Sequence, residues 1–502
     1  MKSPSINSRP AEGVTSFASH MRSALVQPLV LIAITIVVTM GGCAKNLATG
    51  ERHLNFTSEN QEVAMGQEAD KEISASLGLY ADAALQKYVQ QLGTKLAATS
   101  ERPNLPWTFR VVDDPVVNAF AVPGGFIYVT RGILAHLSNE AELAGVMGHE
   151  IGHVTAQHSV HSMATQQLTQ FGLGIGTMLK PGLQRYAELA SAGLGVLFLK
   201  FSRDDESQAD ELGVRYMTRT HHDPHQLSEV MTMLNRVGGG GEGRVPEWLA
   251  THPNPENRRE HIAELIKTAQ PTNGTSVINE ESYLRRLDGM VFGLNPREGF
   301  FKGNTFFQPD LKFRFEFPSG WKTANQKQGV LAVSPEQDAI VQITFANKKS
   351  AAEAANEFFS QSGLTAQRAG SGNIHGFRTS SGSFTAQTEQ GVLQGSAAFV
   401  EYDGRVYQLL GYTSQTRWSN YESGMTQAIK SFDRLTDSKM LSVQPQHLKL
   451  VTINRNMSLT EFNRQYPSEA SLEVLALINQ VESNEQLRAG QQVKRIVGEK
   501  FE

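Results

Sequence analysis

Residues 149–153 form the pentad His149-Glu150-Ile151-Gly152-His153, which limits both the local structure and the chemistry of this chain. On an α-helix, two histidines four residues apart share one face, so both imidazoles can reach a single ion. Glu150 projects about 100° away from His149 around the helix, beside such an ion, where a general base belongs. The pentad therefore predicts a helical metal site. The alternative is a structural helix that carries two solvated histidines.

The residues before the pentad favour a helix. Asn139, followed three residues later by Glu142, is typical of a capping box at a helix N-terminus. Leu143, Val146 and Met147 then continue an apolar stripe at helical spacing.

A third metal ligand decides the class of site. Ala156 and Ser159 stand where a metzincin needs glycine and histidine, so the metzincin class is excluded. Glu206 and Asp210 are again four residues apart on one predicted helical face. Glu206 would complete a His₂Glu site with an open position for water, and Asp210 could fix the tautomer of a ligand histidine. For this pair alone, a solvated helix face is the alternative.

These two motifs and two others, in the same order, resemble the minigluzincin metallopeptidases. This group contains the HtpX-like and CAAX prenyl proteases, and the resemblance is to its soluble periplasmic branch. The other two motifs are residues 118–132, NAFAVPGGFIYVTRG, and residues 251–258, THPNPENR. The resemblance spans residues 60–268.

The resemblance implies that His149, His153 and Glu206 bind one Zn²⁺ per chain. Glu150 would then activate water for attack on a peptide carbonyl. Asp210 would orient a ligand histidine.

The resemblance also implies roles for His252 and Arg258. In some periplasmic relatives the loop that carries the corresponding histidine swings in as an extra, inhibitory metal ligand. Arg258 would position the substrate or this loop. Simple packing of a proline-rich turn is the alternative for both residues. The first motif would be an active-site edge strand, to which a peptide substrate adds as a further strand. Its expected substrate-facing residues are Asn118, Phe120, Val122, Gly124 and Gly125.

The N-terminal region resembles a bacterial lipoprotein signal. Leu25–Val38 is an apolar stretch too short to span a membrane, and small residues precede Cys43, the only cysteine. Lipidation of Cys43 and a periplasmic location follow as expectations. Ala44 favours the outer over the inner membrane. An ordinary cleaved signal and an uncleaved anchor are the alternatives, and Met21 is an alternative start.

The composition fits about three globular domains in 502 residues, with 40% hydrophobic residues. The formal charge of −4 gives no global basic field for nucleic acid. The predicted class is α+β, with a mainly helical gluzincin-type domain that contains a small active-site sheet. The expected divisions are a signal peptide with lipobox (1–43), a zinc metallopeptidase domain (44–268), a connector (269–304), an α+β accessory domain (305–438) and a LysM-like domain (445–502).

The second half of the chain carries no cluster of titratable residues, which favours packing or partner docking. Its pattern resembles a Mog1/PsbP-type sandwich, with predicted strands at 311–317 and 339–345, helices at 351–359 and 421–432, and a hairpin turn at Asp403-Gly404. The tail resembles a degenerate LysM module, with strands at 449–453 and 492–497 around helices at 458–465 and 472–478. Asn456-Met457 replaces the usual Gly-Asp, so peptidoglycan binding and a structural cap both stay open.

Two further segments are expected to lie around the cleft. The apolar runs 171–179 and 189–199 are too short to cross a membrane and predict a lid-like helical hairpin. The run Gly238–Gly241 is either a hinge or a plain linker.

The sequence as a whole predicts a zinc endopeptidase for unfolded or misassembled envelope proteins. Two alternatives stay open. One is a chaperone-like assembly scaffold with a latent metal site, and the other is a cell-wall-tethered binding protein.

Overall fold

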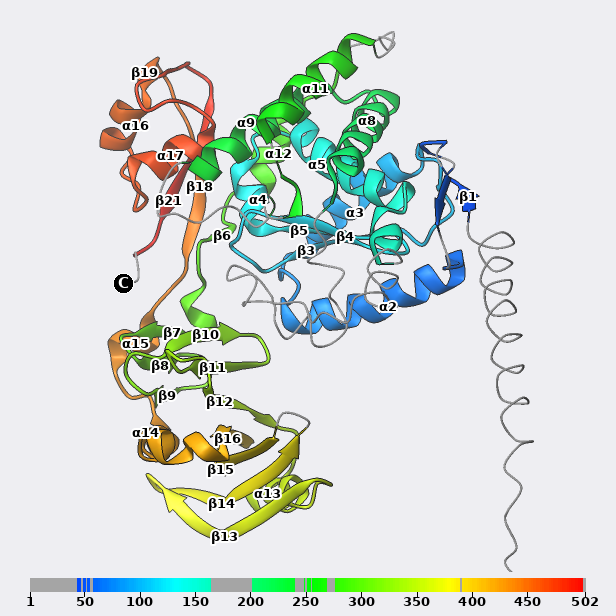
Figure 1. The fold of residues 1–502 in the computed structure, drawn as a ribbon. Coiled ribbons are helices and arrows are strands. Elements are labelled where there is room, and N and C mark those ends of the chain that lie inside the picture. Colours follow the sequence, from blue (N-terminus) through cyan, green and yellow to red (C-terminus); the bar gives the residue numbers. More distant parts are fainter. Residues whose placement is uncertain are drawn as a thin grey trace, which may run out of the picture.

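A computed structural model describes residues 43–46, 48–50, 52–54, 57–163, 201–239, 248, 251–253, 255–268, 276–388 and 391–499 (Figure 1). The predicted signal segment before Cys43, the two apolar runs and residues 240–241 of the glycine run lie outside this part. Among the described residues, no helix is both long enough and apolar enough to cross a membrane.

The first part of the chain is mainly helical, as predicted. Its main helices are α2 (Glu59–Ser76), α3 (Ala83–Ala97), α4 (Arg131–His136), α5 (Glu140–Thr155), α8 (Arg203–Arg219), α9 (His225–Gly239) and α11 (Pro255–Thr268). A short antiparallel pair, β1 (Cys43–Lys45) and β2 (Arg52–Leu54), precedes them.

A small sheet accompanies these helices and confirms the predicted active-site sheet. It consists of β3 (Thr108–Val112), β4 (Ala119–Val122) and β5 (Phe126–Thr130), in the order β3-β5-β4. β3 runs parallel to β5, whereas β4 runs antiparallel to it. Gly124 and Gly125 form the β4–β5 turn with φ of +82° and +96°, a backbone conformation that favours glycine. In the part of the chain that the structure describes, the order β3-β5-β4 leaves β4 as an edge strand.

α5 carries the pentad and crosses α8 at close range. The Asn139 side chain accepts a hydrogen bond from the Glu142 backbone N–H and caps α5, as the sequence predicted. Every residue of α5 from Ala141 to Thr155 is buried. A Cβ added at Gly152 would lie 3.0 Å from the carbonyl oxygen of Ala209 on α8. Glycine thus favours the close approach that brings the two helices' functional side chains together.

The α+β region contains a seven-stranded antiparallel sheet in the order β10-β11-β12-β16-β15-β14-β13. Its strands are β10 (Lys322–Gln326), β11 (Gly329–Val333), β12 (Ala339–Ala346), β13 (Leu364–Ile374), β14 (Phe377–Thr388), β15 (Gly391–Tyr402) and β16 (Arg405–Ser414). The predicted strand at 339–345 and the hairpin turn at Asp403-Gly404 are confirmed, with both turn residues at positive φ.

Both faces of this sheet are covered. α13 (Ala351–Phe359) packs on the face that includes Phe399, with the bounds that the sequence predicted. α14 (Trp418–Lys430) packs on the face that includes Val400, one residue later in the same strand. That second face also meets a four-stranded sheet of β7 (Phe300–Lys302), β8 (Thr305–Gln308), β9 (Phe313–Glu316) and β17 (Asp433–Arg434). The short helix α15 (Ser438–Ser442) follows.

The tail has the predicted strand–helix–helix–strand order. It consists of β18 (Gln446–Thr452), α16 (Leu459–Gln465), α17 (Leu472–Asn479) and β21 (Gln492–Val497), with β18 antiparallel to β21. A small pair, β19 (Met457–Ser458) with β20 (Gln486–Leu487), was not predicted. Figure 1 shows this tail beside α4 and α9, on the opposite side from α2.

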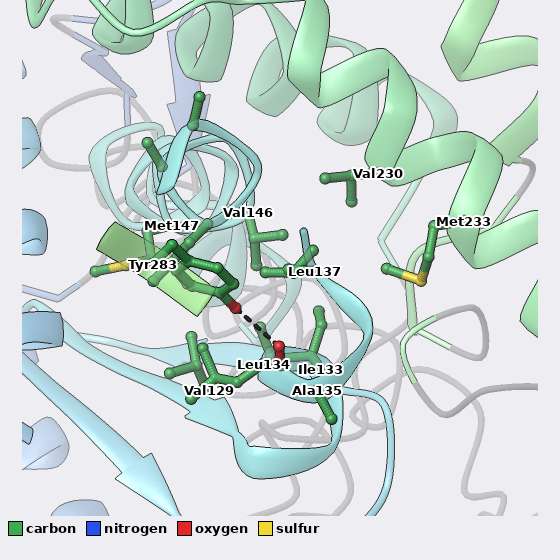
Figure 2. Close-up of a cluster of buried hydrophobic side chains, with 14 of the residues drawn as sticks. Val129, Ile133, Leu134, Ala135, Leu137, Val146, Met147, Val230, Met233 and Tyr283 are labelled. Atoms are coloured by element: carbon green, nitrogen blue, oxygen red, sulfur yellow. Dashed lines mark hydrogen bonds between the residues drawn. The ribbon is translucent and has the colours of Figure 1, made fainter. Parts of the chain in front are cut away.

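The segment expected as a connector contributes to the core of the first region. It forms α12 (Glu280–Leu287) and β6 (Val291–Phe292), and β6 pairs with β18 of the tail. The hydroxyl of buried Tyr283 donates a hydrogen bond to the Leu134 carbonyl at 2.8 Å, and Figure 2 shows this bond among the apolar side chains between α12 and α4.

The tail and the pentad helix share polar contacts as well as one hydrophobic core. Buried Lys494 donates from Nζ to the carbonyls of Ala135 and Leu137, at 3.0 and 2.8 Å. Gln480 donates to the His136 carbonyl at 2.9 Å and to Glu142 Oε2 at 2.8 Å. Three consecutive carbonyls at the corner between α4 and α5 are therefore held by the tail.

Candidate metal centre

Three separate segments bring four metal-binding side chains together. His149 and His153 come from α5, Glu206 from α8, and His252 from the segment just before α11. All four are buried, with at most 2% of each residue exposed. Their donor atoms lie within 4.8 Å of one another.

The spacing of these donors fits a tetrahedral zinc site. The Nε2 atoms of His149 and His153 are 3.0 Å apart, and Nε2 of His149 is 3.3 Å from Nδ1 of His252. Glu206 Oε1 is 2.8 Å from Nδ1 of His252 and 3.6 Å from Nε2 of His153. Ligands about 2.0 Å from a tetrahedral ion are about 3.3 Å from each other, and three imidazoles with one carboxylate are donors that zinc prefers. The cluster thus fits the predicted zinc, with His252 as a fourth donor.

Asp210 and Arg258 support the ligands from behind. Oδ1 of Asp210 lies 3.0 Å from Nδ1 of His149. The Arg258 guanidinium donates to both Asp210 oxygens, at 2.8 and 2.5 Å, and lies 2.7 Å from Glu206 Oε2. Although burial opposes the charge, the guanidinium and His149 hold the pKa of Asp210 well below its usual range. Arg258 therefore contacts two carboxylates of the site itself.

Trp248 and Phe201 complete the wall around His252. The Trp248 ring stacks on the His252 ring at 4.6 Å between centroids, and the guanidinium of Arg258 lies 4.8 Å from the Trp248 ring centroid. The ring centroids of Phe201 and His153 are 4.0 Å apart. Sequence reasoning missed both aromatics. An aromatic residue four positions before His252 was the available signal.

Glu150 lies in the same buried pocket but outside the donor cluster. Its Oε1 receives no hydrogen bond from the described residues and lies 3.7 Å from Nε2 of His252. Burial disfavours a charged His252, but the carboxylates of Glu206 and Glu150 outweigh this and raise the pKa of His252. A buried carboxylate oxygen with a vacant acceptor position, next to the metal ligands, suits a proton acceptor.

The expected substrate strand lies next to the pentad helix. β4 contains Phe120 and Val122 and contacts α5. The Phe120 ring stacks on that of Tyr128 in β5, at 4.9 Å between centroids, and the Oδ1 atom of Asn118 is buried without a hydrogen-bond partner among the described residues.

The part of the chain that matches known proteins contains all four metal-binding side chains. The model of peptidase family M48 matches residues 83–266, from α3 into α11. The mitochondrial metalloendopeptidase OMA1 of Schizosaccharomyces pombe is 30% identical over 242 residues, which cover 47% of this chain and 70% of that protein. The chain belongs to peptidase family M48. The pentad, Glu206 and His252 give this M48 chain an intact metal site.

Other M48 relatives share the same part of the chain. The beta-barrel assembly-enhancing proteases of Yersinia pestis and Escherichia coli (strain K12) are 32% and 31% identical over 210 residues. The chain spans 43% of the length of each, and 40% of this chain is matched.

One solved structure aligns with a different part of the chain. A cyanobacterial PsbP protein from Synechocystis sp. PCC 6803 is 16% identical and has a TM-score of 0.22. The alignment covers 26% of this chain and 91% of that protein. A TM-score this low does not show a common fold, so the Mog1/PsbP resemblance stays a prediction.

Proposed function

We propose that this M48 chain is a zinc endopeptidase that hydrolyses peptide bonds of unfolded or misassembled proteins of the bacterial envelope. One observation carries the proposal. The buried Glu150 carboxylate, with one oxygen that has no hydrogen-bond partner among the described residues, lies beside four donors whose spacing fits zinc. A purely structural zinc site would have no use for such a carboxylate.

The roles of the side chains follow from their positions. When bound, zinc polarises a peptide carbonyl and lowers the pKa of a coordinated water. Glu150 accepts the proton of the attacking water at Oε1 and later delivers it to the leaving amine. Asp210 keeps a hydrogen on Nδ1 of His149, which leaves Nε2 free as a ligand. Arg258 balances the charge of Asp210 and Glu206 and, through Trp248, holds the segment that carries His252.

His252 acts as a gate. With His252 as the fourth protein ligand, a tetrahedral ion has no position left for water or substrate. Cleavage then requires His252 to leave the site. The same closed arrangement also favours a second candidate function, an assembly scaffold with a latent metal site.

An extended substrate adds to the free edge of β4. Backbone hydrogen bonds to this edge recognise a locally unfolded chain with little regard to its sequence. Asn118, Phe120, Val122 and the Gly124-Gly125 turn are the residues of this strand proposed to contact it. β4 is an edge strand in the described part of the chain, and it contacts the pentad helix, which supports this placement.

The cellular setting rests on the sequence and on the relatives. The name of the bacterial relatives, beta-barrel assembly-enhancing protease, supports a periplasmic role in envelope quality control. A lipid on Cys43 would tether the chain, to the outer membrane rather than the inner. For the LysM-like tail, peptidoglycan binding and a structural role are the two alternatives.

Casein degradation by the purified protein tests the proposal. Glu150→Gln keeps the shape of the site and removes the base, so it should bind zinc and cut about 10²–10⁴-fold more slowly. Glu264→Gln, which changes an exposed glutamate on α11, is the matched control and should cut like the parent. If parent and Glu150→Gln both carry zinc and neither cuts, with or without His252→Ala, the scaffold is the better account.

A further inference from the structure

His158 is a buried histidine for which the chemistry above has no use. It lies five residues after His153, beyond the end of α5, and only 1% of it is exposed. Gln157, just before it, has a φ of +60°, which turns the chain back at the end of the helix. The Gln157 side chain donates to Glu62 Oε2 at 3.1 Å, which helps to hold this turn in place. The turn brings the His158 ring against His153.

The contact between these two rings is a hydrogen bond between equivalent atoms. Nδ1 of His158 lies 3.0 Å from Nδ1 of His153. Since His153 directs Nε2 at the metal-binding cluster, its hydrogen must sit on Nδ1, and that N–H needs an acceptor. The acceptor in reach is Nδ1 of His158, which must then carry no hydrogen.

The other side of His158 assigns its tautomer independently. Nε2 of His158 lies 3.1 Å from Oε1 of Gln208 and 3.7 Å from Oδ1 of Asp205, both on α8. The hydrogen bond at this nitrogen is the one to the Gln208 amide oxygen, which accepts, and the nearby Asp205 carboxylate, which can also only accept, favours the same assignment. Nε2 of His158 therefore carries the hydrogen. Both sides of the ring require the same neutral tautomer.

The geometry points to His158 as a positioning residue that holds the zinc ligand His153 in its Nε2-binding tautomer, with α8 fixing the tautomer of His158. This inference rests on the zinc site of the proposed function and adds a residue to it. His149 and His153 would then be oriented in parallel ways, His149 by Asp210 and His153 by His158.

Charge explains why a neutral acceptor suits this position. The buried carboxylates of Glu150, Glu206 and Asp210 carry three negative charges, and the Arg258 guanidinium with a Zn²⁺ ion would carry three positive ones. A carboxylate at position 158 would add an unbalanced charge to a pocket where uncompensated charge is costly. An imidazole accepts the hydrogen bond and leaves the pocket neutral.

Two substitutions separate orientation of His153 from simple filling of space. His158→Phe keeps an aromatic ring but has no acceptor, so zinc affinity, measured by chelator competition at one pH, should fall about 10–100-fold. His158→Asn places an amide oxygen near the position of Nδ1 and should stay within about threefold of the parent. His261→Phe, at an exposed histidine on α11, is the control and should not change the affinity.

The metal-free proteins and the parent's spectrum complete the test. If His158→Phe lowers the melting temperature of the metal-free protein and leaves zinc affinity unchanged, His158 is only structural and the inference is overturned. In ¹⁵N-histidine spectra of the zinc-loaded parent, the ring missing from His158→Asn should be protonated at Nε2 and bare at Nδ1. A proton at Nδ1 would overturn the inference even if His158→Phe failed to fold. A parent that binds no zinc would instead contradict the proposed function itself.

Discussion

Nδ1 of His252 lies 2.8 Å from Oε1 of Glu206, so a side chain from the segment before α11 meets the carboxylate ligand on α8. This contact makes the metal centre a junction between α5, α8 and the start of α11. It also places the proposed gate directly against a metal ligand. Metal binding, stability and access to the site are therefore connected through these two residues.

Zinc removal should destabilise the protein. The four donors are buried and mutually close, so a bound ion would hold three segments together, and binding to the folded state alone stabilises it. At a free zinc concentration about 1,000 times Kd, the gain is about 4 kcal/mol. Urea unfolding of chelator-treated protein, before and after zinc is restored, measures this gain. Restoration by Mg²⁺ to the same extent would contradict a site built for zinc.

Arg258→Met should unfold more easily than the parent by about 3–5 kcal/mol, because it leaves Asp210 and Glu206 as buried charges without their cation. Urea unfolding of the metal-free proteins measures the difference, because a bound Zn²⁺ would supply a second cation to Glu206. Arg259→Met changes the next residue, which is exposed, and should stay within about 0.5 kcal/mol of the parent. Equal effects of the two substitutions would show that the Arg258 contacts carry no net stability.

Lys494→Met tests whether the tail is part of the peptidase core. The substitution leaves the Ala135 and Leu137 carbonyls without their buried donor, which should cost about 1–3 kcal/mol of unfolding free energy. Lys449→Met, on the neighbouring strand, removes only an exposed ion pair with Asp288 and should cost less than about 1 kcal/mol. A loss for Lys494→Met no greater than for Lys449→Met would argue for an independent tail.

Acid should destabilise the protein through His136. Burial lowers the pKa of His136 to about 4, and its Nδ1 lies 2.8 Å from the Gly132 carbonyl. Between about pH 6.5 and pH 4 the unfolded chain binds a proton that the folded chain excludes, so stability falls as the pH falls. We expect protonation of His136 to lower the free energy of unfolding by about 1–3 kcal/mol. This range is modest because the residue is partly exposed, and solvent weakens the effect of burial.

His136→Asn keeps a donor for the Gly132 carbonyl but cannot be protonated in this range. Urea unfolding of parent and variant at pH 7 and pH 4.5 should show a smaller loss for the variant. Glu140, whose pKa is lowered to about 2 mainly by His222, with Nε2 of His222 at 3.6 Å from its Oε1, loses its contribution only at still lower pH. An equal loss in parent and variant would exclude His136 as the source.

Local sequence patterns were enough to predict several of the regular elements. The pentad at helical spacing, with Asn139 as its cap, gave the helix that is seen as α5. The Asp403-Gly404 dipeptide marked a hairpin because its turn needs positive φ at both residues. These signals depend on neighbours in the chain and so can be read without the fold.

Contacts between residues far apart in the sequence could not be predicted from such local patterns. The placement of His252 within 3.3 Å of His149 depends on how α5, α8 and α11 pack, and the resemblance alone suggested it. The contact of His158 with His153 has no marker in the sequence, because the left-handed turn at Gln157 has no glycine. The contacts of Lys494 join residues more than 350 positions apart, and neither hydrophobic periodicity nor charge pattern predicts such a contact.

Cleavage of casein by His252→Ala, at saturating zinc and with zinc content measured on the same samples, tests the gated site most directly. His261→Ala, an exposed histidine nine residues later, is the control and should match the parent. If His252 closes the site, His252→Ala retains zinc and cuts faster than the parent, because a coordination position becomes free for water and substrate. A zinc-loaded His252→Ala that cuts more slowly than the parent would contradict the gate and assign His252 to catalysis instead.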